Sequence, residues 1–88
     1  MCRNIRTLFN FDPPATEEET RASALQFVRK LSGFAQPSKT NEAAFQRAVE
    51  EVSAAARRLL SALETTRPPR NRQAEAMKAR ERARARFG

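Results

Sequence analysis

Residues 41–64, NEAAFQRAVEEVSAAARRLLSALE, decide the fold of this 88-residue chain. Apolar side chains recur along this stretch at spacings of four, three, four, three and four residues, at Phe45, Val49, Val52, Ala56, Leu59 and Leu63. Such a repeat places one apolar strip along a helix, and the strip packs lengthwise against a partner helix. The stretch therefore predicts a long amphipathic helix over residues 41–64.

A shorter amphipathic helix is expected before it, over residues 17–32. Thr16 and Glu19 have the spacing of a capping box at its start, and Gly33 suits the left-handed residue that ends many helices. Phe34 is placed to make the apolar contact that accompanies such an end. The two helices predict an all-α helical hairpin. The first covers about two thirds of the second, so the N-terminal segment or a second subunit must cover the remainder.

Residues 1–15, MCRNIRTLFNFDPPA, form an apolar strap that ends at two prolines. Its periodicity fits a short helix or an extended strand equally well, so its conformation stays open. The strap, the two helices and the linker belong to a helical body over residues 1–66. The predicted core of that body consists of Ile5, Leu8, Phe9, Phe11, Leu25, Val28, Leu31, Phe34, Phe45, Val49, Val52, Leu59, Leu60 and Leu63.

Residues 67–88 form an Arg-rich C-terminal helix or tail. They hold eight Lys/Arg and two acids, hence +6, whereas residues 1–66 hold nine and eight, hence +1. Pro68 and Pro69 break the helical pattern before the tail, and Asn71 is a suitable N-cap for a third helix. Ala and Arg favour helix there, but the apolar stripe is thin, so we expect fraying without a partner.

The charge density of the tail predicts a phosphate-rich partner, RNA or DNA, bound without sequence specificity. Binding would release counterions, and five or six neutralised phosphates would make log K fall against log salt with a slope of about −3.5 to −5. The cations expected to contact phosphate are Arg70, Arg72, Lys78, Arg80, Arg82, Arg84 and Arg86. The alternative is a solvated tail that only confers solubility.

The loop before residue 41 offers a second candidate anion site. Residues 33–40 match the phosphate-loop pattern except that Ser38 replaces its second glycine, and Pro37 removes an amide donor, so nucleotide hydrolysis is not expected. A helix N-terminus can still hold a phosphate or sulfate. The residues near it are Arg29, Lys30, Lys39, Thr40 and Asn41. Ordinary helix capping explains the same residues.

Cys2 is the one residue with nucleophilic or soft-metal chemistry. Removal of Met1 would leave an N-terminal cysteine flanked by Arg3 and Arg6, and these cations favour a thiolate. We treat Cys2 as a speculative reactive thiol, for thiol or metal chemistry. The alternative is a small residue that merely starts the strap.

Composition excludes several classes of protein. The chain has one Cys and no His, Trp or Tyr, so it forms no internal disulfide and lacks the commonest general base. No apolar run approaches the length of a membrane span or a secretory signal. We therefore expect a cytoplasmic protein without cofactor, metal or identified small-molecule substrate.

With these residues laid out, the chain resembles, essentially end to end, a family of small bacterial proteins known as domain of unknown function 2277. The segments that carry the resemblance are MCRNI, LFNFDPPAT, QFVRKLSGF, PPRNR and KARERARARFG. The resemblance implies a bacterial origin and a self-contained unit, and it carries over no activity. Two positions depart from the family pattern: Thr20, where an apolar residue would suit the first helix, and Gln73.

These observations favour a non-enzymatic interaction or accessory protein whose basic C-terminal arm binds a polyanion. Two alternatives stay open. One is a structural homodimer through the heptad strip of residues 41–64, with a merely solubilising tail. The other is chemistry at Cys2.

Overall fold

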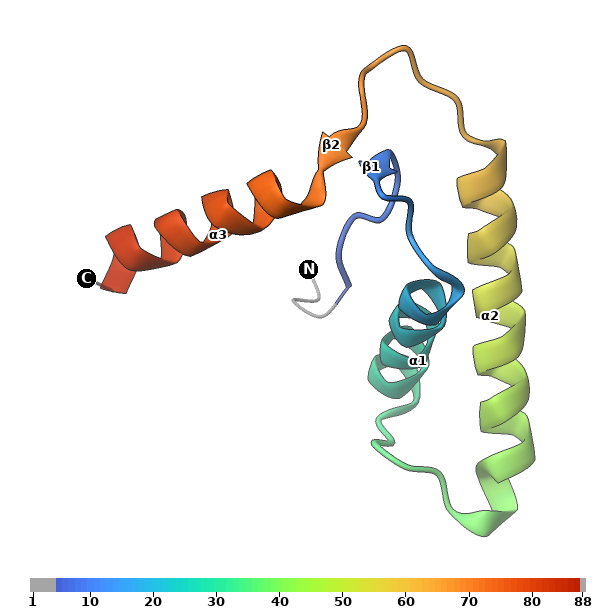
Figure 1. Cartoon of the computed structure of the whole chain (residues 1–88). Helices are drawn as coiled ribbons and strands as arrows, with labels where there is room; N and C mark the ends of the chain where they lie inside the picture. The colour runs from blue at the N-terminus through green and yellow to red at the C-terminus, as the bar shows by residue number, and fades with distance from the viewer. Residues whose placement is uncertain (1–4, 88) are drawn as a thin grey trace.

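The computed structural model describes residues 5–87, and it has an all-α architecture with one very short strand pair, as the sequence predicts. The helical hairpin stands at one side and the third helix projects away from it (Figure 1). In chain order the elements are β1 Phe11–Asp12, α1 Glu17–Ser32, the 3₁₀ turn η1 Lys39–Asn41, α2 Glu42–Ala62, β2 Arg70–Asn71 and α3 Arg72–Phe87.

Both ends of α1 follow the local sequence signals. The Thr16 hydroxyl accepts a hydrogen bond from the backbone N–H of Glu19, and the Glu19 carboxylate accepts one from the N–H of Thr16. Gly33 adopts the left-handed conformation, with φ of 79°, and its N–H donates to the carbonyl of Arg29. Open space surrounds the Gly33 α-carbon, so the backbone angle and not crowding favours glycine there.

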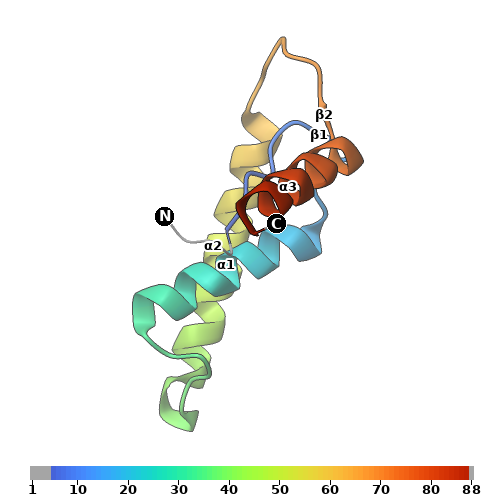
Figure 2. The same ribbon diagram turned by 90° about the vertical axis from the view of Figure 1, so that its left-hand side faces the viewer.

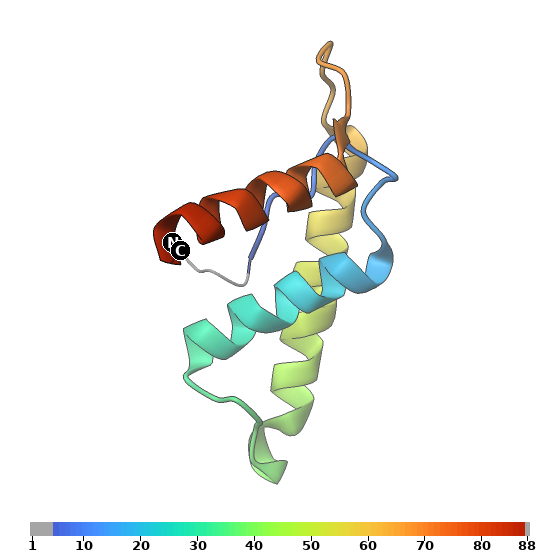
Figure 3. The same cartoon turned by 60° about the vertical axis from the view of Figure 1, so that its left-hand side comes forward.

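The packing of α1 on α2 is oblique and not lengthwise (Figures 2 and 3). The buried apolar core consists of four side chains, Ala24 and Val28 from α1 and Phe45 and Val49 from α2. Leu25, Ala48 and Val52 pack against them and are half-buried. An oblique crossing limits contact to a short part of each helix, so α1 covers only the N-terminal half of the heptad strip.

Four of the predicted core residues are therefore exposed. Leu31 is 76 % exposed, Phe34 42 %, Leu59 56 % and Leu63 42 %. The first two lie beyond the crossing at the loop end of the hairpin, and the other two lie where α2 continues past α1. The prediction that these four side chains are buried was wrong, because the position of an apolar residue in the sequence does not say how much of it another element covers.

Two small polar side chains are buried at the crossing instead. Thr20 is 3 % exposed and donates its hydroxyl hydrogen to the carbonyl of Thr16. Ser53 is 0 % exposed and accepts a hydrogen bond from the guanidinium of Arg57. Their small volume lets the helices approach closely while each hydroxyl keeps a partner.

The basic segment forms a helix from Arg72 to Phe87 rather than an irregular tail. Asn71 caps it, since its side-chain oxygen accepts a hydrogen bond from the N–H of Ala74 at 2.8 Å. The helix leads away from the hairpin (Figure 1).

Candidate functional site

The strap, described from Ile5, is an extended segment whose conformation the sequence left open. It bends at Asn10, which has a φ of 64°, and the Asp12–Pro13 peptide bond is cis. Asparagine tolerates the left-handed region better than most residues because its short side chain can bond locally. The bend turns the strap toward the segment that precedes α3.

The strap and the root of α3 are joined by a short parallel strand pair. Phe11 lies opposite Arg70 and Asp12 opposite Asn71. The N–H of Arg70 donates to the carbonyl of Asn10 at 2.8 Å, and the Asn10 amide donates to the carbonyls of Arg67 and Pro68 at 3.4 and 3.2 Å. The double-proline linker is therefore held against the body.

Phe11 is the aromatic centre of this junction. The guanidinium carbons of Arg70 and Arg72 lie 5.6 and 5.7 Å from the centre of its ring. Both distances are within the range of a cation–π contact. Phe11 is half-buried, so the contact joins two tail cations to the apolar strap.

Arg72 also forms the principal ion pair of the junction. Its two terminal nitrogens donate to the two carboxylate oxygens of Glu19 at 2.8 and 2.9 Å, and its Nε donates to the carbonyl of Pro13 at 2.6 Å. This bidentate geometry gives an Arg–carboxylate pair both a stronger interaction and a fixed orientation. We call Phe11, Glu19, Arg70 and Arg72 the clasp.

Glu19 is the titratable group that the clasp perturbs. Hydrogen bonds from Arg72, and then from the backbone of Thr16, lower the pKa of its carboxyl to about 2. The hydrogen bonds that Arg72 donates to Glu19 in turn raise the pKa of Arg72. The Glu19 carboxylate thus serves the cap of α1 and the anchor of α3 at once.

Sequence reasoning missed the clasp. It assigned Glu19 to a capping box alone and placed Arg70 and Arg72 among the cations expected to contact phosphate. A two-residue strand pair has no periodicity to detect. The available signal was that both partner segments, FDPP and RPPRNR, carry a proline pair beside a short extended stretch.

Beyond the clasp, residues 78–86 form what we call the distal arm. Its cations Lys78, Arg80, Arg82, Arg84 and Arg86 are all exposed. Within residues 5–87, the side chains of Arg80, Arg82 and Arg84 make no hydrogen bond or ion pair, whereas Arg86 does have an interaction. Lys78 has only a long contact with Glu75, at 3.9 Å.

Helical spacing sorts these cations into two ridges. Residues 78, 82 and 86 follow one ridge and residues 80 and 84 another, with Ala79 and Ala83 between them. Successive cations on a ridge are about 6 Å apart along the helix axis. The arm therefore presents positive charge on two sides of a narrow alanine face.

The second candidate anion site lies on the loop between α1 and α2, where two of its side chains hydrogen-bond to loop residues. The Nε of Arg29 donates to the carbonyl of Ala35, and the Asn41 amide donates to the hydroxyl of Ser38. Lys30, Lys39 and Thr40 are exposed. The structure thus uses Arg29 and Asn41 to hold the loop. Cys2 lies outside the described residues.

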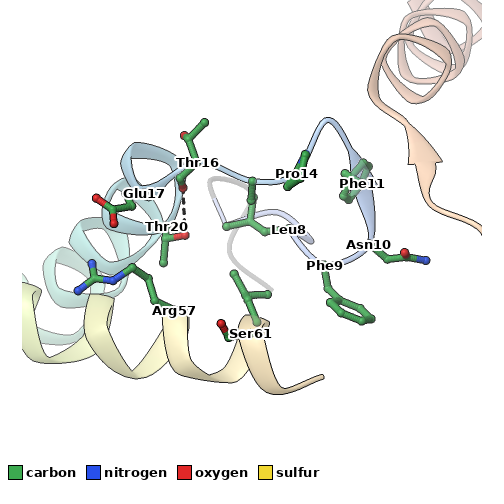
Figure 4. Close-up of a pocket in the computed structure, with 12 residues that line it drawn as sticks. Leu8, Phe9, Asn10, Phe11, Pro14, Thr16, Glu17, Thr20, Arg57 and Ser61 are labelled. Carbon is green, nitrogen blue, oxygen red and sulfur yellow. Dashed lines mark hydrogen bonds between the residues drawn. The ribbon is translucent and has the colours of Figure 1, made fainter. Parts of the chain in front are cut away.

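Two hollows flank the strap. One, of about 430 Å³, lies between the strap, the start of α1 and the C-terminal half of α2. Leu8 and Phe9 line one side of it and Arg57 and Ser61 the other (Figure 4). The second, of about 540 Å³, lies between the strap and α3, with Arg6 and Arg82 among its lining residues.

Two further observations concern residues 5–87 alone. No three His, Cys, Asp or Glu side chains there lie close enough together to hold one metal ion. None of the helices in that range combines the length and the apolar character needed to cross a membrane.

The fold and the clasp define a small all-α protein in which a helical hairpin carries an anchored basic helix. A family model described as an uncharacterized conserved protein, DUF2277, matches residues 1–78, and the chain belongs to this family. The match includes the clasp and ends within α3, so residues 79–88 lie beyond it. No curated protein and no solved structure matches the chain.

Proposed function

We propose that the protein is a non-enzymatic, cytoplasmic nucleic-acid-binding protein whose distal arm contacts phosphates without reading sequence. The observation that carries this proposal is the exposure of five cations within nine residues of one projecting helix. A helix of this charge density attracts phosphate polymers and gains free energy by releasing their counterions.

The contact set is narrower than the seven cations expected from the sequence. We leave Arg72 out of the proposed phosphate-contact set because Glu19 already neutralises its charge in a bidentate ion pair. Arg70 keeps its charge but lies over Phe11 at the root of the helix. The proposed set is therefore Lys78, Arg80, Arg82, Arg84 and Arg86.

The clasp supports the proposal by preorganising the arm. A free tail would lose backbone freedom on binding, which weakens affinity. Here α3 is capped at Asn71 and tied to α1 through Arg72 and Glu19, so its first turns are ordered in advance. Binding to phosphates therefore costs less conformational entropy than it would for a free tail.

The same geometry argues against base recognition. Stacking on single-stranded bases needs an open aromatic face. Phe11, the aromatic residue of the clasp, is half-buried, and the guanidinium groups of Arg70 and Arg72 lie over its ring. The expected binding is therefore electrostatic and tolerant of sequence.

The test is fluorescence anisotropy with a labelled homopolymer RNA across a series of salt concentrations. Five neutralised phosphates predict a slope of log K against log salt of about −3.5 to −4.5. The triple variant R80Q/R82Q/R84Q replaces three unpaired cations by glutamine, which also favours helix. It should bind at least about tenfold more weakly and lower the slope by about 2 to 3.

A matched control removes the same charge from the hairpin. The variant K30Q/K39Q/R58Q replaces three exposed cations, two of them from the second candidate anion site. Near-wild-type affinity of this control supports the arm as the binding element. Equal losses in both variants, or an affinity that does not respond to salt, would overturn the proposal.

A further inference from the structure

The hollow between the strap and α3 carries cations on two of its walls. Its volume is about 540 Å³, within the range of pockets that hold one small molecule. Arg6 lines it from the strap and Arg82 from α3, and both residues are exposed. Within residues 5–87, neither guanidinium makes a hydrogen bond or ion pair. Two segments far apart in the sequence thus bring an available positive charge to one hollow.

The clasp fixes the root end of this hollow. Phe11, Glu19 and Arg72 line it there, and the ion pair of Arg72 with Glu19 joins α3 to α1. The short strand pair joins the strap to the same junction, from which the strap and α3 diverge (Figure 1). The two cationic walls are therefore positioned before a ligand binds, which lowers the entropic cost of binding.

The acids that line the hollow leave its outer part positive. Glu19 is already paired with Arg72, and Glu75 is the other lining acid. Glu75 lies 3.9 Å from the ammonium of Lys78. It also precedes Arg82 by seven residues, which places it about 10 Å nearer the root of α3. A ligand near Arg82 is thus separated from both carboxylates.

The chemistry of the walls defines the class of ligand. A guanidinium donates two parallel hydrogen bonds to phosphate oxygens, so a phosphodiester matches the cations. The walls formed by Leu8, Ala76 and Ala79 are apolar and suit the carbon face of a sugar. A positively charged groove that follows the backbone is a common binding surface for single strands. A duplex is too wide to place one of its nucleotides in a hollow of this volume.

We infer that the hollow holds one nucleotide unit of a single-stranded nucleic acid, with its phosphate between Arg6 and Arg82. The inference rests on the proposed function and extends it in two ways. It adds a cation of the strap to the contact set, and it selects single strands over duplexes. The contacts are to sugar and phosphate, so binding stays independent of sequence.

Fluorescence anisotropy of the full chain with two labelled probes tests the inference. The probes are an oligouridine of about 12 nucleotides and a duplex RNA of the same length. Arg6→Gln should weaken oligouridine binding at least about fivefold, because it removes a charged donor from a phosphate. The same change should alter duplex binding by less than about twofold.

Arg58→Gln is the matched control for this measurement. Arg58 is an exposed arginine of the hairpin, and its side chain makes no hydrogen bond or ion pair within residues 5–87. Its replacement removes the same charge from a surface outside the hollow. Both affinities should stay within about twofold of the wild-type values.

A double-mutant cycle tests whether the two arginines share a phosphate. Residues with a common partner give non-additive losses, whereas independent residues give additive ones. The combined loss of affinity in R6Q/R82Q should be smaller than the product of the single losses by about threefold or more. R6Q/R80Q is the control pair, because Arg80 is not among the residues that line the hollow. Its combined loss should equal the product within about twofold.

Circular dichroism of each variant shows whether the helices remain folded. The inference would be overturned by unchanged oligouridine binding in Arg6→Gln, by equal losses for the two probes, by an equal loss in Arg58→Gln, or by additive losses in R6Q/R82Q. In each of these cases a loss of binding in R80Q/R82Q/R84Q leaves the proposed function standing. Wild-type affinity of R80Q/R82Q/R84Q would overturn the proposed function and the inference with it.

Discussion

The guanidinium of Arg72 donates two hydrogen bonds, of 2.8 and 2.9 Å, to the carboxylate of Glu19, a residue 53 positions earlier in the chain. Glu19 simultaneously accepts the N–H of Thr16 and closes the cap of α1. A single carboxylate therefore couples the start of one helix to the root of another. The basic helix is consequently anchored to the body, although a double-proline segment precedes it.

Glu19→Gln separates the two roles of this side chain. Glutamine can still accept the Thr16 N–H, so the cap is preserved while the ion pair is lost. We expect the free energy of unfolding to fall by about 0.5 to 1 kcal/mol, a small value because solvent screens a carboxylate that is 35 % exposed. Urea denaturation followed by circular dichroism measures the loss.

Glu18→Gln is the control for that measurement. Glu18 is an exposed acid of the same first turn, and within residues 5–87 its carboxylate makes no hydrogen bond or ion pair. Its replacement should change stability by less than about 0.5 kcal/mol. Equal losses in the two variants would show that the helix dipole, and not Arg72, makes Glu19 stabilising.

Acid should weaken the clasp in a defined range of pH. The pKa of Glu19 is lowered to about 2 in the folded protein, whereas an unfolded glutamate has a value of about 4.3. Because the folded pKa is the lower one, the stabilisation is fully present above the unfolded value and is lost as the pH falls from about 4.5 toward 2. The stability difference between wild type and Glu19→Gln should shrink across this range. If the stability difference stayed constant between about pH 4.5 and 2, the lowered pKa of Glu19 would be contradicted.

Arg72→Lys should loosen α3 selectively. Lysine keeps the positive charge but cannot make the two-bonded contact with Glu19 or retain the planar contact with Phe11. Amide hydrogen exchange in the first turns of α3 should become about fivefold faster or more, while amides around Val49 keep their protection. Arg47→Lys, in an exposed pair with Glu51, serves as the control and should leave α3 unchanged.

Phe11→Leu tests the aromatic part of the clasp. Leucine keeps an apolar side chain in the strap but removes the ring that both arginines contact. We expect the melting temperature to fall by roughly 4 °C. Phe9→Leu, also half-buried in the strap, should lower it less, and a larger effect at Phe9 would argue that strap packing dominates.

Thr20→Val tests whether the buried hydroxyl matters. Among residues 5–87, the Thr20 hydroxyl bonds only to the carbonyl of Thr16, and that carbonyl also accepts a hydrogen bond from the N–H of Thr20 at 3.1 Å. Valine should therefore match or exceed the wild-type stability, because no polar group is left without a partner. Thr20→Ser, which removes the buried methyl group, should lose about 1 kcal/mol. The opposite order in chemical denaturation would show that the hydroxyl is required.

Local signals predicted the helices well and the packing poorly. The cap at Thr16, the left-handed Gly33 and the N-cap Asn71 depend on side chains only a few residues apart, so their geometry can be inferred from spacing alone. Leu59 and Leu63 have the correct spacing for a buried strip but are exposed. Spacing defines a helical face, and only the path of a second element decides whether that face is covered.

The sequence by itself determined three features: the all-α class, the caps at both ends of α1 and at the start of α3, and the concentration of positive charge after residue 66. Each follows from composition or from short-range hydrogen bonding, which a linear pattern records. The tertiary structure alone decided that α1 crosses α2 obliquely, and that Arg72 pairs with Glu19. Both depend on contacts between distant segments, whose energies are set by where the backbone brings charges and apolar surfaces together.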